Sequence, residues 1–420
     1  MDQSQNASAH ILSLADRCVK CGLCLPQCPT YVLTENENES PRGRIALIQG
    51  WLTGQLSPSK TLTQHLDRCL LCRRCERVCP SVVPFGEIMD QSKALLAEKT
   101  KTRFSLPSFL TNNSLKLLLN KTTSGFLIST LRLLQKTGVF FIARKSGLLK
   151  LVGLQRLISY LPKLEQPLKT KTFYPADTFS PTKLPPRNVA LFTGCLSKQL
   201  DPKTVSASIK LLNHVGYGVY VPEQQVCCGA LHLHEGKKNQ AVTLANKNTR
   251  VFNEQDNITA VISLVNGCTS QLREYSQLET NETFNTEVKD IIEFLAEVDW
   301  PENLKFKPFN KSVALQIPCS LQNSLRAEDK LLSLIKRIPD LSLVTIYNRC
   351  CGAAGSYFLR QPQLSDQLKA QAITQLKQAS PELIISSNLG CALQLKAGLS
   401  EDNISSEVIH PVVLLEQQLT

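Results

Sequence analysis

Two short runs of cysteine constrain what this chain can fold into more than any other feature. Residues 18–28 read CVKCGLCLPQC and residues 69–79 read CLLCRRCERVC, and a proline follows each run. Both runs have the spacing C-x2-C-x2-C-x3-C-P, which is typical of [4Fe–4S] binding. Zinc, the competing metal, usually takes two C-x2-C pairs or mixed cysteine and histidine ligands. The two runs therefore predict two [4Fe–4S] clusters.

The fourth cysteine of each run is expected to bind the other cluster when two such runs occur in one module. The first cluster is then held by Cys18, Cys21, Cys24 and Cys79. The second cluster is held by Cys69, Cys72, Cys75 and Cys28. The chain starts MDQSQNASAH, which lacks the basic and apolar regions of a secretory signal. We therefore expect reduced thiols in a cytosol-like compartment.

The remaining eight cysteines form an internal duplication. The first set is Cys195, Cys227, Cys228 and Cys268, and the second set is Cys319, Cys350, Cys351 and Cys391. Corresponding cysteines lie 124, 123, 123 and 123 residues apart, and CCGA surrounds each adjacent pair. Self-similarity at a fixed period indicates repeated structural units. Buried structural thiols are the weaker explanation, because all sixteen cysteines fall into ordered sets.

Each repeat predicts strands that alternate with helices. The apolar runs VALFTG and VALQIP precede the helical patterns TVSASIKLLNHVG and AEDKLLSLIKRI. Such alternation predicts parallel sheets with helices on both faces, and it places every cysteine just past the carboxyl end of a strand. What the thiols hold stays open between a further iron–sulfur centre in one or both repeats and a redox-active thiol pair.

The net charge of +12 is concentrated in one segment. Between Lys101 and Lys171 there are thirteen Lys and Arg residues and one acid, Glu165. Leu, Phe and Ile recur at helical spacing among these cations, which predicts amphipathic basic helices. A membrane surface, an acidic partner and an ordinary linker all fit this pattern. Nucleic acid is not favoured as a partner, because aromatic platforms and groove-reading motifs are not evident.

Together these features predict an α+β chain. A small, mainly helical, two-[4Fe–4S] ferredoxin-type domain spans residues 1–100, and a basic amphipathic helical linker spans 101–185. The first α/β repeat unit, with a parallel sheet, spans 186–305, and the second spans 306–420. No apolar run of about 18 residues predicts a membrane-spanning helix.

The C…CCG…C repeats, joined to a two-cluster ferredoxin module, resemble the iron–sulfur subunits of bacterial glycolate oxidases. The resemblance covers nearly the whole chain. It includes SPRGRIALI at 40–48, PSVVPFGEIMD at 80–90, CCGALHLHEG at 227–236 and CCGAAGSYFLRQP at 350–362.

This resemblance implies an oxidoreductase complex in which the present chain carries electrons. A separate FAD-containing subunit would oxidise glycolate, or D-lactate, to the 2-oxo acid, and a second flavoprotein subunit is a further candidate partner. Electrons would continue to a quinone or another membrane acceptor. The implied location is cytoplasmic, peripheral on the inner face of the cytoplasmic membrane. No residue of this chain is expected to be catalytic.

A thiol–disulfide reductase of the heterodisulfide type, acting at the CCG repeats, is the alternative function. Relatives of that type often close each repeat with C-x2-C, whereas this chain has Gln271 and Gln394 at the corresponding positions. Ser320 stands where relatives often have histidine. A metal-stabilised scaffold that only docks other subunits is a third hypothesis.

Charged residues beside the cysteine runs are candidates for tuning the clusters. Positive charge there favours the reduced state, while ordinary solvated cations are the alternative; the residues are Arg17, Lys20, Arg73, Arg74 and Arg77. His232 and His234 follow the first CCG and are predicted either as ligands or proton relays, or as satisfied loop residues. His214 and His410 are predicted to be structural.

Overall fold

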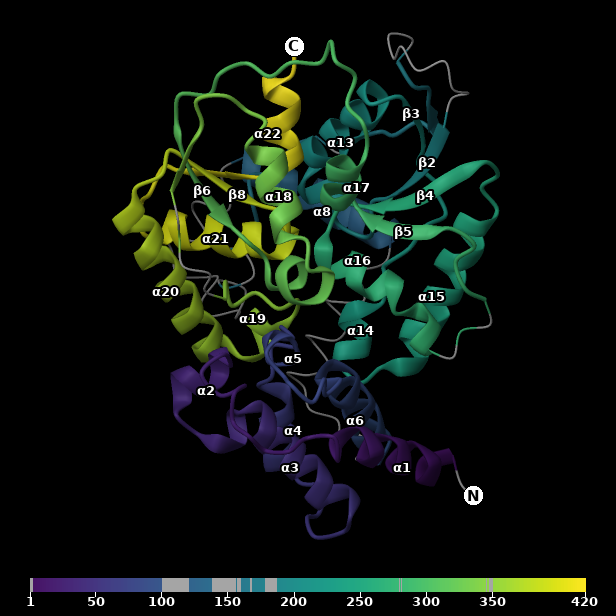
Figure 1. Ribbon diagram of the computed structural model, residues 1–420, viewed down its shortest axis with the longest axis vertical. Helices are drawn as coiled ribbons and strands as arrows, with labels where there is room; N and C mark the ends of the chain where they lie inside the picture. The colour runs from purple at the N-terminus through teal and green to yellow at the C-terminus, as the bar shows by residue number, and fades with distance from the viewer. Residues whose placement is uncertain are drawn as a thin grey trace.

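The computed structural model describes residues 3–99, 121–137, 156, 160–166, 168–177, 187–278, 280, 282–344, 346 and 350–420. A helical N-terminal module, purple in Figure 1, lies below two α/β units. Most of the predicted basic helices between Lys101 and Lys171 lie outside the described residues. Helix α8, Lys121–Lys136, is described and confirms a helix within this predicted segment.

Short helices build the N-terminal module around one apolar core. They are α1 Gln3–Ala15, α2 Pro29–Thr34, the 3-10 helix η1 Glu37–Glu39, α3 Pro41–Leu52, α4 Lys60–Asp67, α5 Arg74–Arg77 and α6 Phe85–Lys99. Pro29 and Pro41 each stand at a helix start, where the missing N–H is not needed. The Ser40 hydroxyl accepts a hydrogen bond from the Gly43 N–H and caps α3. Ile11, Ile48, Leu66, Ile88 and Met89 are fully buried between these helices.

The first α/β unit contains a five-stranded sheet in the order β1-β3-β2-β4-β5. Its elements are β1 Phe173–Tyr174, β2 Arg187–Phe192, α12 Ser197–Leu200, α13 Pro202–His214, β3 Tyr217–Tyr220, α14 Ala230–His234, α15 Lys238–Asn253, β4 Ile258–Ser263, α16 Asn266–Arg273, η2 Tyr275–Leu278, β5 Glu287–Asp290 and α17 Ile291–Glu297. All strand pairs are parallel except β1 with β3. Strand β1 lies within 101–185, the range predicted as a helical linker, and it adds an antiparallel edge to the otherwise parallel sheet.

The second unit repeats this order with a four-stranded parallel sheet, β7-β6-β8-β9. Its elements are β6 Ser312–Gln316, the π-helix η3 Ser320–Leu325, α18 Glu328–Ile335, β7 Ser342–Val344, α19 Tyr357–Arg360, α20 Pro362–Ala379, β8 Leu383–Ser386, α21 Leu389–Glu401, β9 Glu407–Ile409 and α22 Pro411–Gln418.

Alternate residues of the central strands reach opposite faces of each sheet. Val189 and Leu191 of β2 join the core between the two units, while Ala190 and Phe192 face the core beneath α15 and α16. This period of two requires helices on both sides of the sheet. The predicted fold class, a helical two-cluster domain followed by α/β repeats with parallel sheets, is confirmed.

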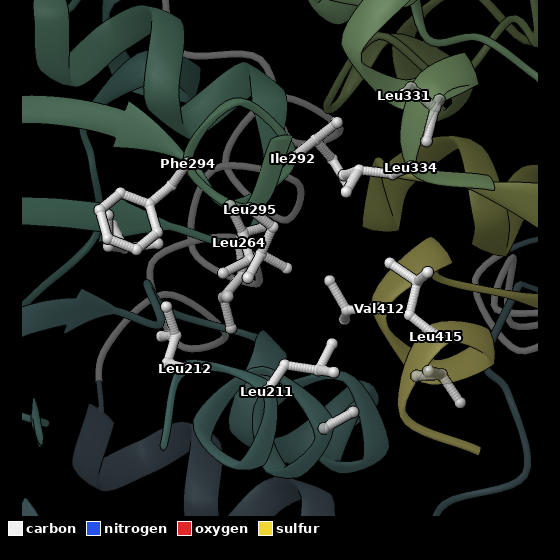
Figure 2. Packing of buried hydrophobic residues seen from close by; sticks show 14 of the residues in the cluster. Leu211, Leu212, Leu264, Ile292, Phe294, Leu295, Leu331, Leu334, Val412 and Leu415 are labelled. Atoms are coloured by element: carbon white, nitrogen blue, oxygen red, sulfur yellow. The ribbon is translucent and has the colours of Figure 1, made fainter. Parts of the chain in front are cut away.

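The two units share one apolar core. Figure 2 shows Leu211 and Leu212 of α13, Phe294 and Leu295 of α17, Leu331 and Leu334 of α18, and Val412 and Leu415 of α22 meeting there. Helix α13 packs on α22 and α17 packs on α18, so in each repeat a helix that follows the first central strand packs on the last helix of the other repeat. This pairing fixes the two sets of strand ends relative to one another.

Candidate iron–sulfur centres

One pocket of the N-terminal module gathers cysteines from both runs. Cys69, Cys72 and Cys75 of the second run line it together with Cys28 of the first. Burial raises the pKa of the Cys75 thiol, and the nearby thiols of Cys72, Cys69 and Cys28 raise it further. Four converging thiols from two distant loops match the ligand set of a [4Fe–4S] cluster. Among the described residues, no three histidine, cysteine or carboxylate side chains converge as a site for a single metal ion.

A buried ion pair borders this pocket, because Arg44 is one of the residues that line it. The Arg44 guanidinium, 1% exposed, donates to Glu39 Oε2 at 2.7 Å, to the His65 carbonyl at 2.8 Å and to Thr30 Oγ1 at 3.1 Å. Glu39 also accepts a hydrogen bond from Arg68 at 2.8 Å. In the sequence, SPRGR is only one of the stretches that carry the family resemblance. An arginine five residues after a glutamate gave no sign of burial.

The remaining cysteines of the two runs, three from the first and Cys79 from the second, lie nearer the surface. Cys18, Cys24 and Cys79 border the apolar core of the module, and Cys21 is exposed. Burial raises the pKa of Cys24, and the thiols of Cys18 and Cys28 add to that rise. The loop of the first run therefore has one side open to solvent at Cys21.

The two runs share an unusual backbone shape. The residue before the second cysteine has a left-handed conformation in both, with φ of 56° at Lys20 and 50° at Leu71. The residue after that cysteine does too, with φ of 88° at Gly22 and 54° at Arg73. Left-handed residues other than glycine are uncommon, so two matching pairs indicate loops shaped for the same task.

The four cysteines of the first repeat also converge. Hydrogen bonds from the thiols of Cys195 and Cys228 lower the pKa of Cys227, and the Gly229 N–H lies 3.5 Å from its sulfur. Hydrogen bonding to Cys227 and to Cys268 raises the pKa of Cys228. All four thiols thus form one contact network at the carboxyl ends of β2, β3 and β4.

Three polar residues that the sequence did not single out position these cysteines. The Asn248 side chain donates to the Cys227 carbonyl at 3.0 Å, and the Tyr275 hydroxyl donates to the Cys228 carbonyl at 2.9 Å. The Gln225 amide oxygen accepts from the Thr193 N–H at 2.7 Å, just before Cys195. A polar residue on the buried face of a helix, as at Asn248, was the available signal.

The second repeat brings its own four cysteines together. The sulfur atoms of Cys351 and Cys391 are 2.9 Å apart, and this hydrogen bond lowers the pKa of Cys351. Burial raises the pKa of Cys319 to about 11, and the neighbouring Cys351 raises it while Arg74 opposes the rise. Burial also raises the pKa of Cys350, and the thiols of Cys351 and Cys319 add to that rise. Gln394, at the position of a further cysteine in heterodisulfide-type relatives, instead donates to Ser365 Oγ at 3.1 Å.

The N-terminal pocket lies against the second repeat. Burial raises the pKa of Cys72, and the Cys319 thiol is the largest charge effect on it. The Asn323 side chain donates to the Cys72 carbonyl at 2.8 Å, and the Tyr357 hydroxyl donates to the Arg68 carbonyl at 3.0 Å. Thiols of the second run and of the second repeat are therefore neighbours.

The cations of the second run are engaged with the repeats. Arg73 pairs with Glu274 and Arg77 pairs with Glu328, so neither is an ordinary solvated cation. Their charges are largely balanced, which weakens the prediction that they tune a cluster on their own. Arg17 and Lys20 of the first run are exposed.

The histidines mainly have structural contacts. His234 Nδ1 lies 3.0 Å from Asp90 Oδ1 and joins α14 to α6, so its hydrogen bond is satisfied, although it lies at the end of a helix and not in a loop. His232 is buried, and its proximity lowers the pKa of Cys227. His214 pairs with Asp177, and His410 caps α22 by accepting the Val412 N–H.

Comparison with known proteins agrees with this arrangement. Residues 14–83 match a family described as a 4Fe-4S dicluster domain, and residues 189–273 and 313–396 each match one described as a cysteine-rich domain. Lactate utilization protein A of Shouchella clausii is 23% identical over 241 residues, which cover 55% of this chain and 99% of that protein. No described helix is long and apolar enough to cross a bilayer.

Two relatives extend over almost the full chain. The glycolate oxidase iron-sulfur subunit of Escherichia coli (strain K12) is 29% identical over 434 residues, which cover 100% of this chain and 98% of that protein. The probable glycolate oxidase iron-sulfur subunit of Bacillus subtilis (strain 168) is 31% identical over 407 residues, which cover 93% of this chain and 90% of that protein. This chain belongs to the family of glycolate oxidase iron–sulfur subunits.

Proposed function

We propose that this chain carries electrons away from an FAD-containing subunit that oxidises glycolate, or D-lactate, to the 2-oxo acid. A quinone or another membrane acceptor receives them, and a second flavoprotein subunit completes the complex. The chain acts in the cytoplasm, at the inner face of the cytoplasmic membrane. The names of the full-length relatives support the hydroxy-acid complex.

The contact of Cys72 with the second repeat is the observation that carries this proposal: Asn323 donates to its carbonyl at 2.8 Å, and Cys72 and Cys350 border the same apolar cluster. This contact places the thiols of Cys28, Cys69, Cys72 and Cys75 next to those of the second repeat. Electron transfer between two centres requires that they lie close together. The same grouping supports assigning Cys69, Cys72, Cys75 and Cys28 to one [4Fe–4S] cluster. Cys18, Cys21, Cys24 and Cys79 hold the other.

The repeats supply the ligands of further iron–sulfur centres in this proposal. Cys195, Cys227, Cys228 and Cys268 form one set, and Cys319, Cys350, Cys351 and Cys391 form the other. Iron–sulfur clusters, when bound, accept and release single electrons at potentials set by charge and burial. The residues around them have separate tasks, because Asn248 and Tyr275 orient the cysteine backbone while Arg44 and Glu39 support the N-terminal pocket.

Metal analysis and a single substitution test this function. Anaerobically purified protein should contain about eight irons if only the N-terminal sites fill, and about sixteen if both repeats fill as well. Cys72→Ser should reduce glycolate:quinone turnover while flavin reduction in the partner stays at the wild-type rate. Ser57→Ala, an exposed substitution, should leave both unchanged. Iron-free protein with full activity, or equal turnover in Cys72→Ser, would refute the proposal.

Thiol–disulfide reduction at the repeats is the second candidate. The separation of 2.9 Å between Cys351 and Cys391, and the lowered pKa of Cys351, suit a reactive thiol pair. The isolated chain would then reduce a disulfide substrate with a dithiol donor and without a flavoprotein. Cys351→Ser would abolish that reaction, whereas Cys21→Ser, in the N-terminal module, would spare it.

A further inference from the structure

The loop that carries the first cysteine run has exposed apolar side chains. Val19 is 68% exposed and Leu23 is 57% exposed, and they flank the exposed Cys21. Val82, three residues after Cys79, is 67% exposed and has φ of 47°, a backbone region that β-branched residues rarely adopt. Apolar side chains that remain exposed beside a proposed redox site indicate an interaction surface.

The matching loop of the second run shows which kind of protein surface packs against such a loop. Leu70 has the same place in its run as Val19, yet it is only 7% exposed because it packs with Tyr357 and Leu368 of the second repeat. The cations of that loop meet carboxylates, since Arg73 pairs with Glu274. An apolar contact rimmed by acids therefore covers the second run from within the chain.

The loop of the first run also carries cations and apolar side chains, but without the apolar and acidic contacts that cover the loop of the second run. Arg17 and Lys20 are exposed, and neither forms an ion pair with any residue that the structure describes. Cations and apolar side chains thus alternate along residues 17–24. A cover for this loop needs an apolar centre and carboxylates at its rim, as the repeats provide for the second loop.

We propose that residues 17–24 form the surface on which the flavin-bearing subunit docks, through an acid-rimmed apolar face. This inference rests on the proposed function and adds where the partner binds. A membrane is the less suitable occupant, because the equivalent loop is covered by protein and surface-bound segments are usually amphipathic helices. Docking here places the partner beside Cys21, the most exposed ligand of the proposed clusters.

Binding measurements with two matched variants test the docking surface. One variant, Val19→Asp/Leu23→Asp, removes the apolar centre, and the other, Arg17→Glu/Lys20→Glu, reverses the cations. Leu56→Asp, at a side chain 43% exposed elsewhere in the module, is the control. The probe is the purified flavoprotein subunit of the same organism, titrated calorimetrically into the full chain without oxygen. We expect each double variant to bind about tenfold more weakly or worse, with unchanged iron content and EPR spectrum, and the control to bind normally.

The possible results separate the two proposals. Wild-type affinity in both double variants overturns the docking surface and leaves the electron-transfer function intact. A wild-type chain that neither binds the flavoprotein nor takes electrons from it overturns both. Loss of binding to phosphatidylglycerol vesicles in these variants, with flavoprotein affinity unchanged, assigns the loop to the membrane and also overturns the inference. If Val19→Asp/Leu23→Asp loses iron, the flavoprotein affinity of Arg17→Glu/Lys20→Glu alone decides whether the docking surface is correct.

Discussion

Arg73 and Glu274 form a two-point ion pair that joins residues 201 positions apart. Nη2 of Arg73 lies 2.7 Å from Oε2 of Glu274, and a second hydrogen bond links the same two groups. The side chains are 16% and 21% exposed. Burial opposes the charge of Arg73, yet the hydrogen bond to Glu274 holds its pKa above the ordinary value. The pair fastens the second cysteine run to the first repeat, while Asn323 fastens it to the second repeat.

Two substitutions at Arg73 should separate the ion pair from the backbone shape. Both Arg73→Gly and Arg73→Ala remove the pair, but only alanine keeps a Cβ at φ of 54°. We expect Arg73→Gly to be more stable than Arg73→Ala by about 0.5–1 kcal/mol. Alanine has a conformational penalty in the left-handed region, and the greater entropy of glycine in the unfolded chain offsets part of that difference. Anaerobic urea unfolding measures the difference. Equal stability of the two variants would show that the loop relaxes and stores no strain.

Local patterns explain why so much of the fold could be predicted. The strands at Val189 and Val313 are short apolar runs, and each is followed by a helical pattern, so the cysteines were expected just past strand ends. The exchange of Cys28 between the runs was likewise predicted from spacing, and it stays a prediction that the pocket supports. Both inferences start from patterns that are local in sequence, an apolar run in one case and the cysteine spacing within a run in the other.

Contacts between distant segments could not be predicted in the same way. Glu274 is one of many acids, and nothing near it in sequence indicates Arg73 as its partner. Strand β1 has two residues, Phe173–Tyr174, and exists only because the edge of β3 is available. Asn248 and Tyr275 resemble ordinary helical residues until the fold buries them beneath a cysteine pair. Tertiary packing, rather than local propensity, decides each of these.

Asp290 should make stability depend on pH. Its carboxyl is buried where the Asn266 amide and the Thr269 hydroxyl donate to it at 2.8 Å, and burial raises its pKa from 3.8 to about 6. The folded state therefore holds the proton more tightly than the unfolded state. Stability from this group is present at low pH and is lost as pH rises through 6, by about 1.4 kcal/mol between pH 5 and pH 8.

The substitution Asp290→Asn isolates that contribution. The difference in unfolding free energy between wild type and Asp290→Asn should change by about 1.4 kcal/mol between pH 5 and pH 8, because only wild type loses stability at this site. Asn285→Ala, at an exposed loop residue, should follow the wild-type pH dependence. Parallel curves for wild type and Asp290→Asn would contradict the raised pKa.

Breaking the Arg44–Glu39 pair should be far more harmful than breaking an exposed pair. Arg44→Met leaves the fully buried Glu39 carboxylate without its main partner, and we expect a loss of about 3 kcal/mol or more. Lys377→Met removes the exposed pair with Asp402, whose side chains are 50% and 37% exposed, and should cost less than about 1 kcal/mol. Denaturant unfolding compares them. Similar losses of unfolding free energy in the two variants would mean that Arg68 and His65 are enough to balance the buried charge of Glu39.

Alanine substitutions at two glycines test how tightly the second repeat is packed. Gly352 directly follows Cys350 and Cys351, and Gly54, in the N-terminal module, is the control. Both have left-handed backbones, with φ of 79° and 78°, so alanine at either carries a conformational penalty of about 1–2 kcal/mol. A Cβ at Gly352 would lie 2.6 Å from the Ser365 carbonyl oxygen, whereas one at Gly54 has no atom within 4 Å. The Gly352 N–H also lies 3.4 Å from the Cys350 sulfur, so displacing this turn should move Cys350 and Cys351. We therefore expect Gly352→Ala, unlike Gly54→Ala, to lower iron content and to expose those thiols to an alkylating reagent mapped by mass spectrometry. Equal labelling in the two variants would mean that the turn yields without disturbing the cysteines.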